Sequence, residues 1–307
     1  MSLIVIVALA AGGALAGRFF PALQKAGRVL SFLQSLCLFA VLAAMGVKIG
    51  LDEEIFQSIP NIGLTALAFA ALSAAGSVLT VWLLTIPLRK KKFEGAAEEE
   101  HSGSALPMTL AILGTIGAGV IAGRLLCGKA ILSAETVDTI INIGLMGIVL
   151  GAGIDFGRRK EAVEVLKKNG LGLLLVPLGV IVGSIAFSAA GGLLLGVSPA
   201  GSAAVGAGLG WYSYSGVAIA TVNVELGAVA FLANILREMI TLAAAPVVAK
   251  KLGGLCTVAL GGATVMDTTL PVIVRSAGSA YGPVSLVSGM LTTMAVPLLV
   301  GLFLPLI

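Results

Sequence analysis

Three charged residues lie near the middle of long apolar stretches of the sequence. Arg237 and Glu238 fall near the middle of the stretch 226–249, and Asp267 is the one charged residue within 252–274. A charged side chain at the centre of a bilayer costs roughly 2.5–3.5 kcal/mol, and such residues usually mark an ion or substrate path. The alternative is a structural ion pair between Arg237 and Asp267, which would leave the second carboxylate unexplained.

The sequence around Asp267 interrupts its apolar stretch with glycine and proline. Residues 261–271 read Gly-Gly-Ala-Thr-Val-Met-Asp-Thr-Thr-Leu-Pro, so the hydroxyls of Thr264, Thr268 and Thr269 accompany the carboxylate. Glycine and proline break helices and free backbone carbonyl and N–H groups. Unwound backbone near the middle of the membrane coordinates ions and substrates in many transporters. We therefore expect a binding site for a small charged solute here.

A second glycine-rich segment, 206–216, matches the first in character. It reads Gly-Ala-Gly-Leu-Gly-Trp-Tyr-Ser-Tyr-Ser-Gly, and its candidate binding residues are Trp211, Tyr212, Ser213 and Ser215. The glycines lack the preceding strand and the spacing of a nucleotide-binding fingerprint. The aromatic side chains either form an interfacial belt or line the mouth of a pocket.

These segments belong to a chain whose composition is that of an integral membrane protein. Of its 307 residues, 58% are hydrophobic and 11% charged, whereas soluble domains are about half apolar and about a quarter charged. The mean hydropathy is +1.09. A membrane-crossing helix needs about 20 apolar residues. The sequence therefore predicts an all-α polytopic membrane protein.

We expect about eight transmembrane helices plus two broken or re-entrant segments. The first apolar stretch is interpreted as a span and not as a signal peptide, because no basic segment precedes it. The two broken segments, 201–222 and 252–274, are either re-entrant hairpins or discontinuous helices. The expected spans are 3–17, 30–50, 62–88, 106–126, 137–154, 170–197, 226–249 and 284–307.

The distribution of basic residues predicts the orientation of these spans. With eight spans and the N-terminus outside, 14 of the 19 basic residues lie in cytoplasmic connectors. Three (Lys48, Arg124 and Lys129) lie in external ones. If the broken segments cross completely, the chain has ten spans and the split falls to 12 against 5. Positive residues favour the cytoplasmic side, so both termini are predicted outside a bacterial inner membrane.

The first two thirds of the chain contain a weak internal repeat. Ala-Gly-Arg at 16–18 recurs at 122–124, and the end of the second span, 45–52, recurs loosely at 150–157. Three spans per unit would insert the second copy inverted, as in many secondary transporters. We therefore divide the chain into a first three-helix repeat (1–88), a charged cytoplasmic linker (89–105), a second repeat (106–197) and a substrate-site region (198–307).

No enzyme chemistry is evident in the sequence. The single histidine, His101, lies in the charged linker, and no nucleophile–base pair or metal-ligand cluster is visible. We expect no cofactor, no metal, no catalytic residue and no nucleic-acid partner. The net charge of +4 is explained by the topology of the connectors.

The segments 208–216, 234–238 and 261–272 resemble, in order and spacing, the LysO family of bacterial lysine exporters. The resemblance extends loosely over the whole chain. It implies eight spans with both ends outside and two intramembrane acidic residues associated with export, which match Glu238 and Asp267. The stretch 217–228 and the acidic residues 98–100 depart from the family pattern and leave substrate detail open. The candidate substrate- and proton-binding residues are Asp267, Glu238, Arg237, Thr264, Thr268, Thr269, Ser213, Ser215, Tyr212, Trp211 and Asn234.

Two intramembrane carboxylates complement the two ammonium groups of lysine. A helix N-terminus, free backbone N–H groups or Arg237 could take the substrate carboxylate. Exporting a cation against an inside-negative potential costs about 2.3 kcal/mol per 100 mV, so we expect proton antiport. We expect both carboxylates to be buried, which favours their neutral form, so each would be either protonated or paired with lysine. The expected partners are L-lysine, protons and the lipid bilayer, with a homodimer as a possible assembly.

Two other functions are compatible with parts of this pattern. A sodium or proton antiporter needs the same broken helices and intramembrane acids, but its substrate is the cation alone. A membrane receptor or scaffold would carry no flux and would leave the paired acids unexplained. The sequence does not distinguish lysine from ornithine, arginine or toxic analogues.

Overall fold

A computed structural model describes residues 3–20, 27–51, 53–86, 105–126, 134–158, 164–165 and 170–307. All regular structure in these ranges is helical. The α-helices are α1 (Leu3–Phe19), α3 (Gly27–Leu51), α4 (Glu53–Leu84), α5 (Ala105–Leu126), α6 (Ala134–Arg158), α8 (Leu175–Leu194), α9 (Pro199–Gly206), α10 (Tyr212–Ala220), α11 (Val224–Leu252), α12 (Gly254–Gly261), α13 (Leu270–Ala277) and α14 (Gly282–Phe303). Short 3-10 helices are η2 (Leu171–Leu174), η3 (Gly262–Met266), η4 (Ser279–Tyr281) and η5 (Leu304–Leu306).

Six helical segments of the described chain are long and apolar enough to cross a bilayer: 27–51, 61–84, 135–158, 171–194, 224–252 and 279–306. Shorter apolar helices cover 4–19 and 254–266. Large apolar side chains such as Leu64 and Ile143 are exposed on the outer faces, as a hydrocarbon solvent allows. The predicted all-α polytopic membrane fold is confirmed.

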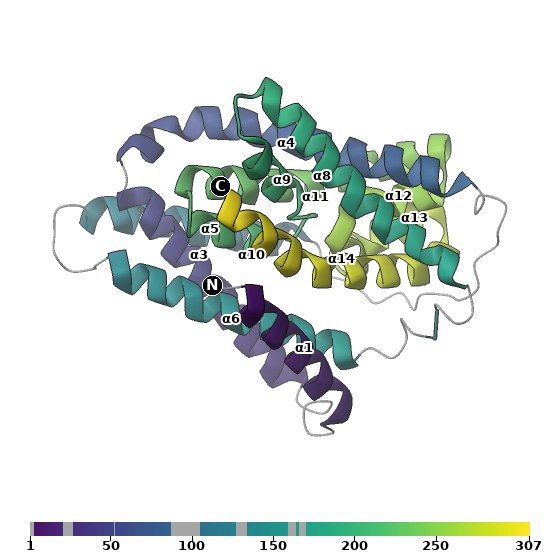
Figure 1. The fold of residues 1–307 in the computed structure, drawn as a ribbon, viewed down its shortest axis with the longest axis horizontal. Helices are drawn as coiled ribbons and strands as arrows, with labels where there is room; N and C mark the ends of the chain where they lie inside the picture. The colour runs from purple at the N-terminus through teal and green to yellow at the C-terminus, as the bar shows by residue number, and fades with distance from the viewer. Residues whose placement is uncertain are drawn as a thin grey trace.

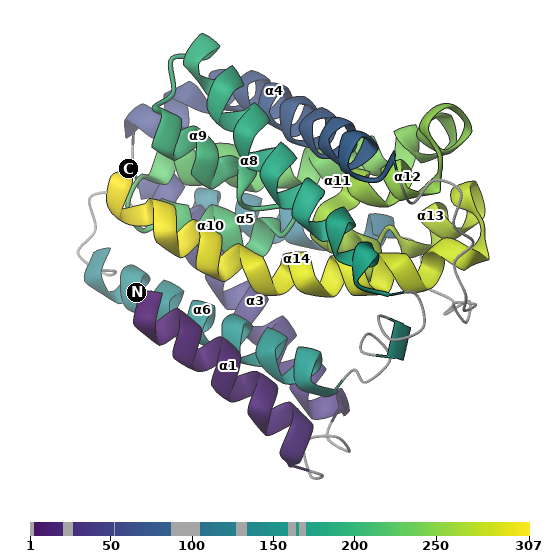
Figure 2. The same cartoon turned by 45° about the vertical axis from the view of Figure 1, so that its right-hand side comes forward.

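The helices α1, α3, α5 and α6 form one packed group, with α1 beside α6 (Figures 1 and 2). Glycines let the backbones approach closely. A Cβ on Gly46 of α3 would meet the Ile116 carbonyl of α5, and one on Gly119 would meet the Ala43 carbonyl in return. This reciprocal contact is compatible with two inverted three-helix units, which stay a prediction. Residues 89–104 of the predicted linker lie outside the described residues.

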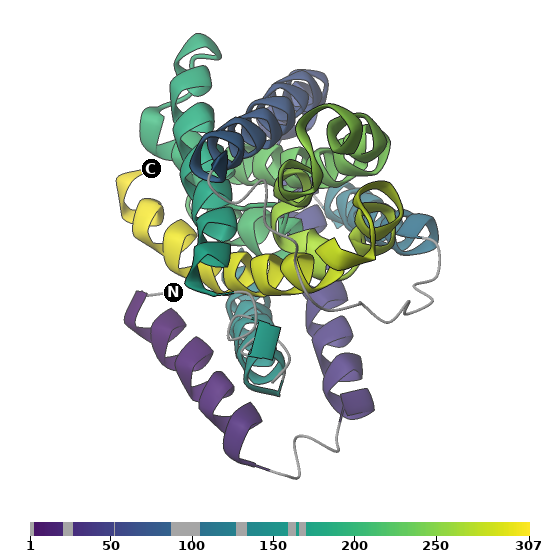
Figure 3. The ribbon, with the colours of Figure 1, turned by 90° about the vertical axis from the view of Figure 1, so that its right-hand side faces the viewer.

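The second group is built on α4, α8, α11 and α14 (Figure 3). Helices α4 and α8 run antiparallel and cross at Gly76 and Gly183, each of which lies against the other's backbone carbonyl. The two groups contact each other mainly through α10 and α14. The polar cavity described below is lined by residues of both groups.

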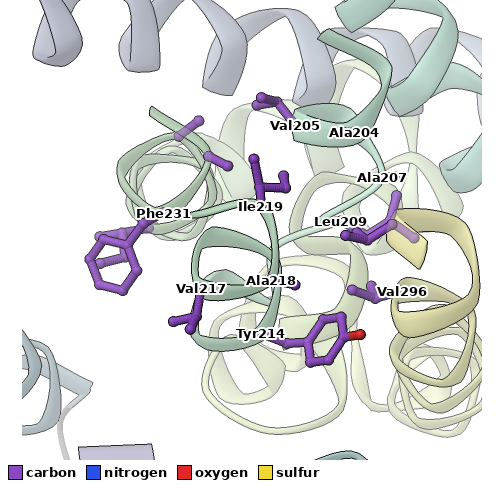
Figure 4. Close-up of a cluster of buried hydrophobic side chains, with 14 of the residues drawn as sticks. Ala204, Val205, Ala207, Leu209, Tyr214, Val217, Ala218, Ile219, Phe231 and Val296 are labelled. Atoms are coloured by element: carbon purple, nitrogen blue, oxygen red, sulfur yellow. The ribbon is translucent and has the colours of Figure 1, made fainter. Parts of the chain in front are cut away.

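The first broken segment folds back on itself as a hairpin of α9 and α10. Gly201, at the start of α9, lies against Leu226, at the start of α11. At the other end of the hairpin, Ala220 of α10 lies against Gly227 of α11. Both ends of the hairpin are therefore near the start of α11. Its apolar core is formed by side chains of α9, α10, α11 and α14 (Figure 4).

The second broken segment, α12 to α13, is also a hairpin. Gly254, at the start of α12, packs against the ring of Tyr281, which follows α13. This hairpin begins directly after the C-terminal end of α11. The two hairpins thus enter the helix bundle from opposite ends of α11. Of the two alternatives left open by the sequence, the folded-back arrangement is the one that the structure has.

Candidate transport site

The tips of the two hairpins meet beside the middle of α11. The backbone N–H of Ala263 donates a hydrogen bond of 2.8 Å to the carbonyl oxygen of Leu209. The tips turn through left-handed backbone, with φ of 50° at Leu209, 96° at Gly210 and 63° at Gly262. Such angles cost little for glycine and more for leucine. The contact leaves no room at Gly262 for a side chain, whose Cβ would meet the Leu209 carbonyl.

Asn234 of α11 holds the first tip. Its Oδ1 accepts a 2.7 Å hydrogen bond from the backbone N–H of Gly210. Its Nδ2 donates to the Ala230 carbonyl at 2.8 Å and to the Ser215 hydroxyl at 3.3 Å. A buried amide with several partners fixes its surroundings, since each group that lost its partner would cost free energy. Asn234 therefore acts on the shape of the tip.

Arg237, one helical turn further along α11, holds the second hairpin. Its side chain is fully buried. Nε donates to the Leu260 carbonyl at 2.8 Å and Nη2 to the Ala259 carbonyl at 3.2 Å. Nη1 donates to the Ser184 hydroxyl at 3.0 Å and Nη2 to the Ser77 hydroxyl at 2.9 Å. The guanidinium thus joins α11 to α4, α8 and α12. It forms no ion pair with Asp267, so the structural-pair alternative for these two residues does not apply.

Glu238 points to a different side of α11 from Arg237. Its side chain is 6% exposed, interacts with the Thr268 side chain and lies close enough to Asp267 for electrostatic interaction. Tyr212 lies close to both carboxylates. The expectation that Asp267 is buried is wrong, because the residue is exposed in the structure; its Oδ1 accepts a 2.6 Å hydrogen bond from the Thr268 N–H. The two carboxylates therefore form one polar cluster.

This cluster lines a cavity of about 410 Å³. The cavity lies between the hairpin tips, α14 and the facing helices α3 and α6. Its size suits a small organic solute, since ligand pockets usually measure about 300–1,000 Å³. The lining residues are Ser31, Gln34, Ser35, Leu38, Ile148, Ala152, Asp155, Phe156, Gly210, Trp211, Tyr212, Ser213, Glu238, Ala263, Thr264, Met266, Asp267, Thr268, Met290, Thr293 and Met294.

The structure divides the sequence-predicted residues into two sets. Those that line the cavity are Asp267, Glu238, Thr264, Thr268, Ser213, Tyr212 and Trp211. Those that support the hairpins from behind are Arg237, Asn234, Ser215 and Thr269. Tyr214 is buried in the core next to Trp211, with ring centroids 5.4 Å apart. Within the described residues no group of three or more His, Cys, Asp or Glu side chains could hold a metal ion.

The sequence reasoning missed the α3–α6 side of the cavity. Asp155 was noted only as part of the internal repeat, yet its carboxylate lines the cavity together with Gln34. Both lie near the ends of their apolar stretches, where polar residues are common. The signal that could have found them was their expected position along the membrane normal. Both lie near the span ends that adjoin basic connectors, and so at a similar level in the membrane.

A separate contact involving Lys48 joins the two helix groups at the other end of α3. Lys48 Nζ lies 2.8 Å from Asp138 Oδ1 of α6 and donates to the Ala220 carbonyl of α10 at 3.2 Å. It therefore bridges α3 and α6 to the end of the first hairpin. The cavity is lined by the opposite halves of α3 and α6, so this contact lies on the far side of the hairpin tips.

An all-helical membrane protein with two opposed hairpins that meet at a charged cavity has the architecture of a membrane transporter. Residues 113–304 match the family model of the lysine exporter LysO, and the chain belongs to that family. The resemblance of segments 208–216, 234–238 and 261–272 is thereby confirmed. Membership in this family indicates a membrane transporter.

Two curated relatives carry related descriptions. The chain is 26% identical to the lysine exporter LysO of Escherichia coli K12 over 309 residues, which cover 98% of each chain. It is 31% identical over 148 residues to a Haemophilus influenzae protein provisionally assigned as a lysine exporter, covering 45% of this chain and 75% of that one. No solved structure matches the chain.

Proposed function

We propose that the protein exports L-lysine and close cationic analogues from the cytoplasm in exchange for protons. The observation that carries this proposal is the cluster of Glu238, Asp267 and Thr268 on the wall of a solute-sized cavity. The E. coli relative, which matches over nearly the whole chain, is a lysine exporter by name. Two carboxylates on the cavity wall complement the charge of a cationic solute, but not that of a neutral or anionic solute.

Exchange follows from competition for the two carboxylates. An ammonium group and a proton cannot both satisfy the same carboxylate oxygen, so binding of one displaces the other. The enclosed setting of Glu238 strengthens this competition, because an unpaired charge in a low-dielectric interior is costly. Thr268 can donate to a carboxylate in the empty site, so the wall keeps its shape between occupants.

The proposed orientation places both termini outside a bacterial inner membrane. The connectors expected in the cytoplasm follow α6 and α11, where Arg158, Lys250 and Lys251 lie. The cavity is lined by the α6 half that ends at Arg158 and by the α3 half that begins at Gly27. In this orientation the cavity faces the cytoplasm, which is the loading side for an exporter. The surrounding bilayer and a homodimer complete the proposed partners.

The test is lysine flux in proteoliposomes under an imposed pH gradient. Wild-type protein should move lysine, whereas Asp267→Asn and Glu238→Gln should not, although both variants remain in the membrane. Glu225→Gln is the matched control, because Glu225 lies exposed in the first turn of α11 and does not line the cavity. Normal lysine export by both cavity variants would refute the proposal.

A sodium or proton antiporter is the second candidate, because the same carboxylates would serve it. Proton or sodium flux that is independent of lysine, with no lysine movement, would establish it. Lysine-dependent thermal stabilisation of the purified protein would favour the exporter, since a ligand that binds the folded state stabilises it by mass action.

A further inference from the structure

A second carboxylate position faces the cavity from α6. Asp155 lines the cavity together with Gln34 of α3, and its side chain is 40% exposed. Its Oδ2 accepts a 2.9 Å hydrogen bond from Gln34 Nε2. Its Oδ1 lies 3.4 Å from Arg158 Nη1, one turn along the same helix. Neither of these contacts involves the cluster around Glu238, so this is a separate polar wall of the same cavity.

Two glycines make room for the partners of Asp155. A Cβ on Gly151 would lie 2.5 Å from Gln34 Nε2, so a larger residue at this place would have to displace the amide. A Cβ on Gly27 would lie 2.9 Å from Arg158 Nη2. The amide and the guanidinium therefore occupy space that any larger residue would fill. The two glycines therefore leave room for both partners of Asp155.

The contact with Arg158 is too long to saturate Asp155. Strong N–H···O bonds between charged groups measure about 2.7–2.9 Å, and exposed ion pairs contribute about 0–1 kcal/mol. The carboxylate can therefore accept a further donor from the cavity. Beside it, the Gln34 amide provides an N–H donor suited to a carboxylate, whereas Arg158 contacts Asp155 without lining the cavity itself. The wall thus offers an acceptor for an ammonium and a donor for a carboxylate side by side.

We propose that Asp155 and Gln34 bind the α-amino-acid head group of the substrate, while Glu238 and Asp267 bind its side-chain ammonium. This inference rests on the proposed function and adds the subsite that would recognise the amino-acid head group and so discriminate lysine from a simple diamine or a metal ion. Asp155 receives the α-ammonium. The head group is therefore held by the α3–α6 group and the side chain by the hairpin group.

The test compares lysine with 6-aminohexanoate, which keeps the carboxylate and the distal ammonium but lacks the α-ammonium. The half-saturating lysine concentration and the inhibition by 6-aminohexanoate are measured in proteoliposomes. Asp155→Asn should raise the half-saturating lysine concentration about 10- to 100-fold, the range for loss of a hydrogen bond between charged groups. It should leave inhibition by 6-aminohexanoate unchanged, so that the preference for lysine nearly disappears.

Two further variants make the result interpretable. Gln34→Met removes both the donor to the substrate carboxylate and the amide that orients Asp155, so it should weaken the binding of both ligands and that of lysine more strongly. Glu135→Gln changes an exposed carboxylate in the first turn of α6, outside the cavity, and should alter neither value. If Asp155→Asn weakens the binding of lysine and 6-aminohexanoate equally, or weakens neither, the assignment of Asp155 is overturned. Lysine export by the wild type would still support the proposed function. If the wild type moves no lysine, the proposed function fails first.

Discussion

Arg237 is expected to support the fold and not to bind substrate, and Arg237→Lys separates these roles. The substitution keeps the charge, so the cost of burying it is retained. However, an ammonium is a compact donor group on a flexible stem, whereas the guanidinium is a planar fork. The four acceptors of Arg237 lie on α4, α8 and α12. Lysine cannot reach all three helices from one nitrogen.

The magnitude follows from the hydrogen bonds that are lost. Hydrogen bonds between helices in a membrane contribute on average about 0.6 and at most about 1.7 kcal/mol each. Losing two of the four should therefore lower the free energy of unfolding by about 1–3 kcal/mol. The maximal lysine flux should fall because the second hairpin loses its anchor. The half-saturating lysine concentration should stay unchanged.

The assay is unfolding of the purified protein in a detergent titration, together with flux measured per inserted molecule. Arg275→Lys is the control, because Arg275 is exposed in the last turn of α13. Unchanged unfolding combined with a raised half-saturating lysine concentration would refute the structural role and return Arg237 to the substrate site.

Three shorter predictions concern the hairpin tips and the Lys48 contact on the far side of them. Gly262→Ala should lower the free energy of unfolding by about 1–2 kcal/mol, because it forces a side chain into left-handed backbone. Gly12→Ala is the control, because Gly12 has open space around it, and it should not lower the free energy of unfolding. Thermal unfolding of both variants measures the difference. Asn234→Leu leaves buried groups unpaired at a cost of about 1–3 kcal/mol and should reduce lysine flux, and full flux would contradict its role at the tip. Lys48→Met removes the bridge between the helix groups and should speed labelling of Ala220→Cys by a membrane-impermeant thiol reagent added outside, whereas unchanged labelling would show that the bridge does not hold that end closed.

Much of the helical architecture could be predicted from hydropathy, and the hairpins could not. The predicted stretch 30–50 lies within α3, and 284–307 covers most of α14 and η5. The breaks at 206–211 and 262–269 follow from glycine and proline. Whether the chain turns back after each break depends on contacts far along the sequence, such as Gly201 with Leu226. Local composition carries no information about those partners.

The roles of Arg237 and Glu238 show the limit for the site. Their position in the sequence predicts that both residues lie at nearly the same depth in the membrane. Adjacent residues on a helix point about 100° apart, so one faces the cavity while the other faces the core. Which one does so depends on how α11 is rotated against α4 and α8. That rotation is set by packing, and the sequence pattern of α11 alone does not reveal it.

The meeting of the hairpin tips determines where the membrane voltage acts. Water filling the cavity would bring a conducting medium to the tips, about halfway along the bundle. The electric field would then fall mainly across the remaining layer, which consists of α9, α10 and the Lys48–Asp138 contact. A cation would enter the cavity almost without crossing the field and would meet nearly all of it in one outward step. The loading of substrate should therefore be insensitive to membrane potential, whereas its release should depend on it steeply.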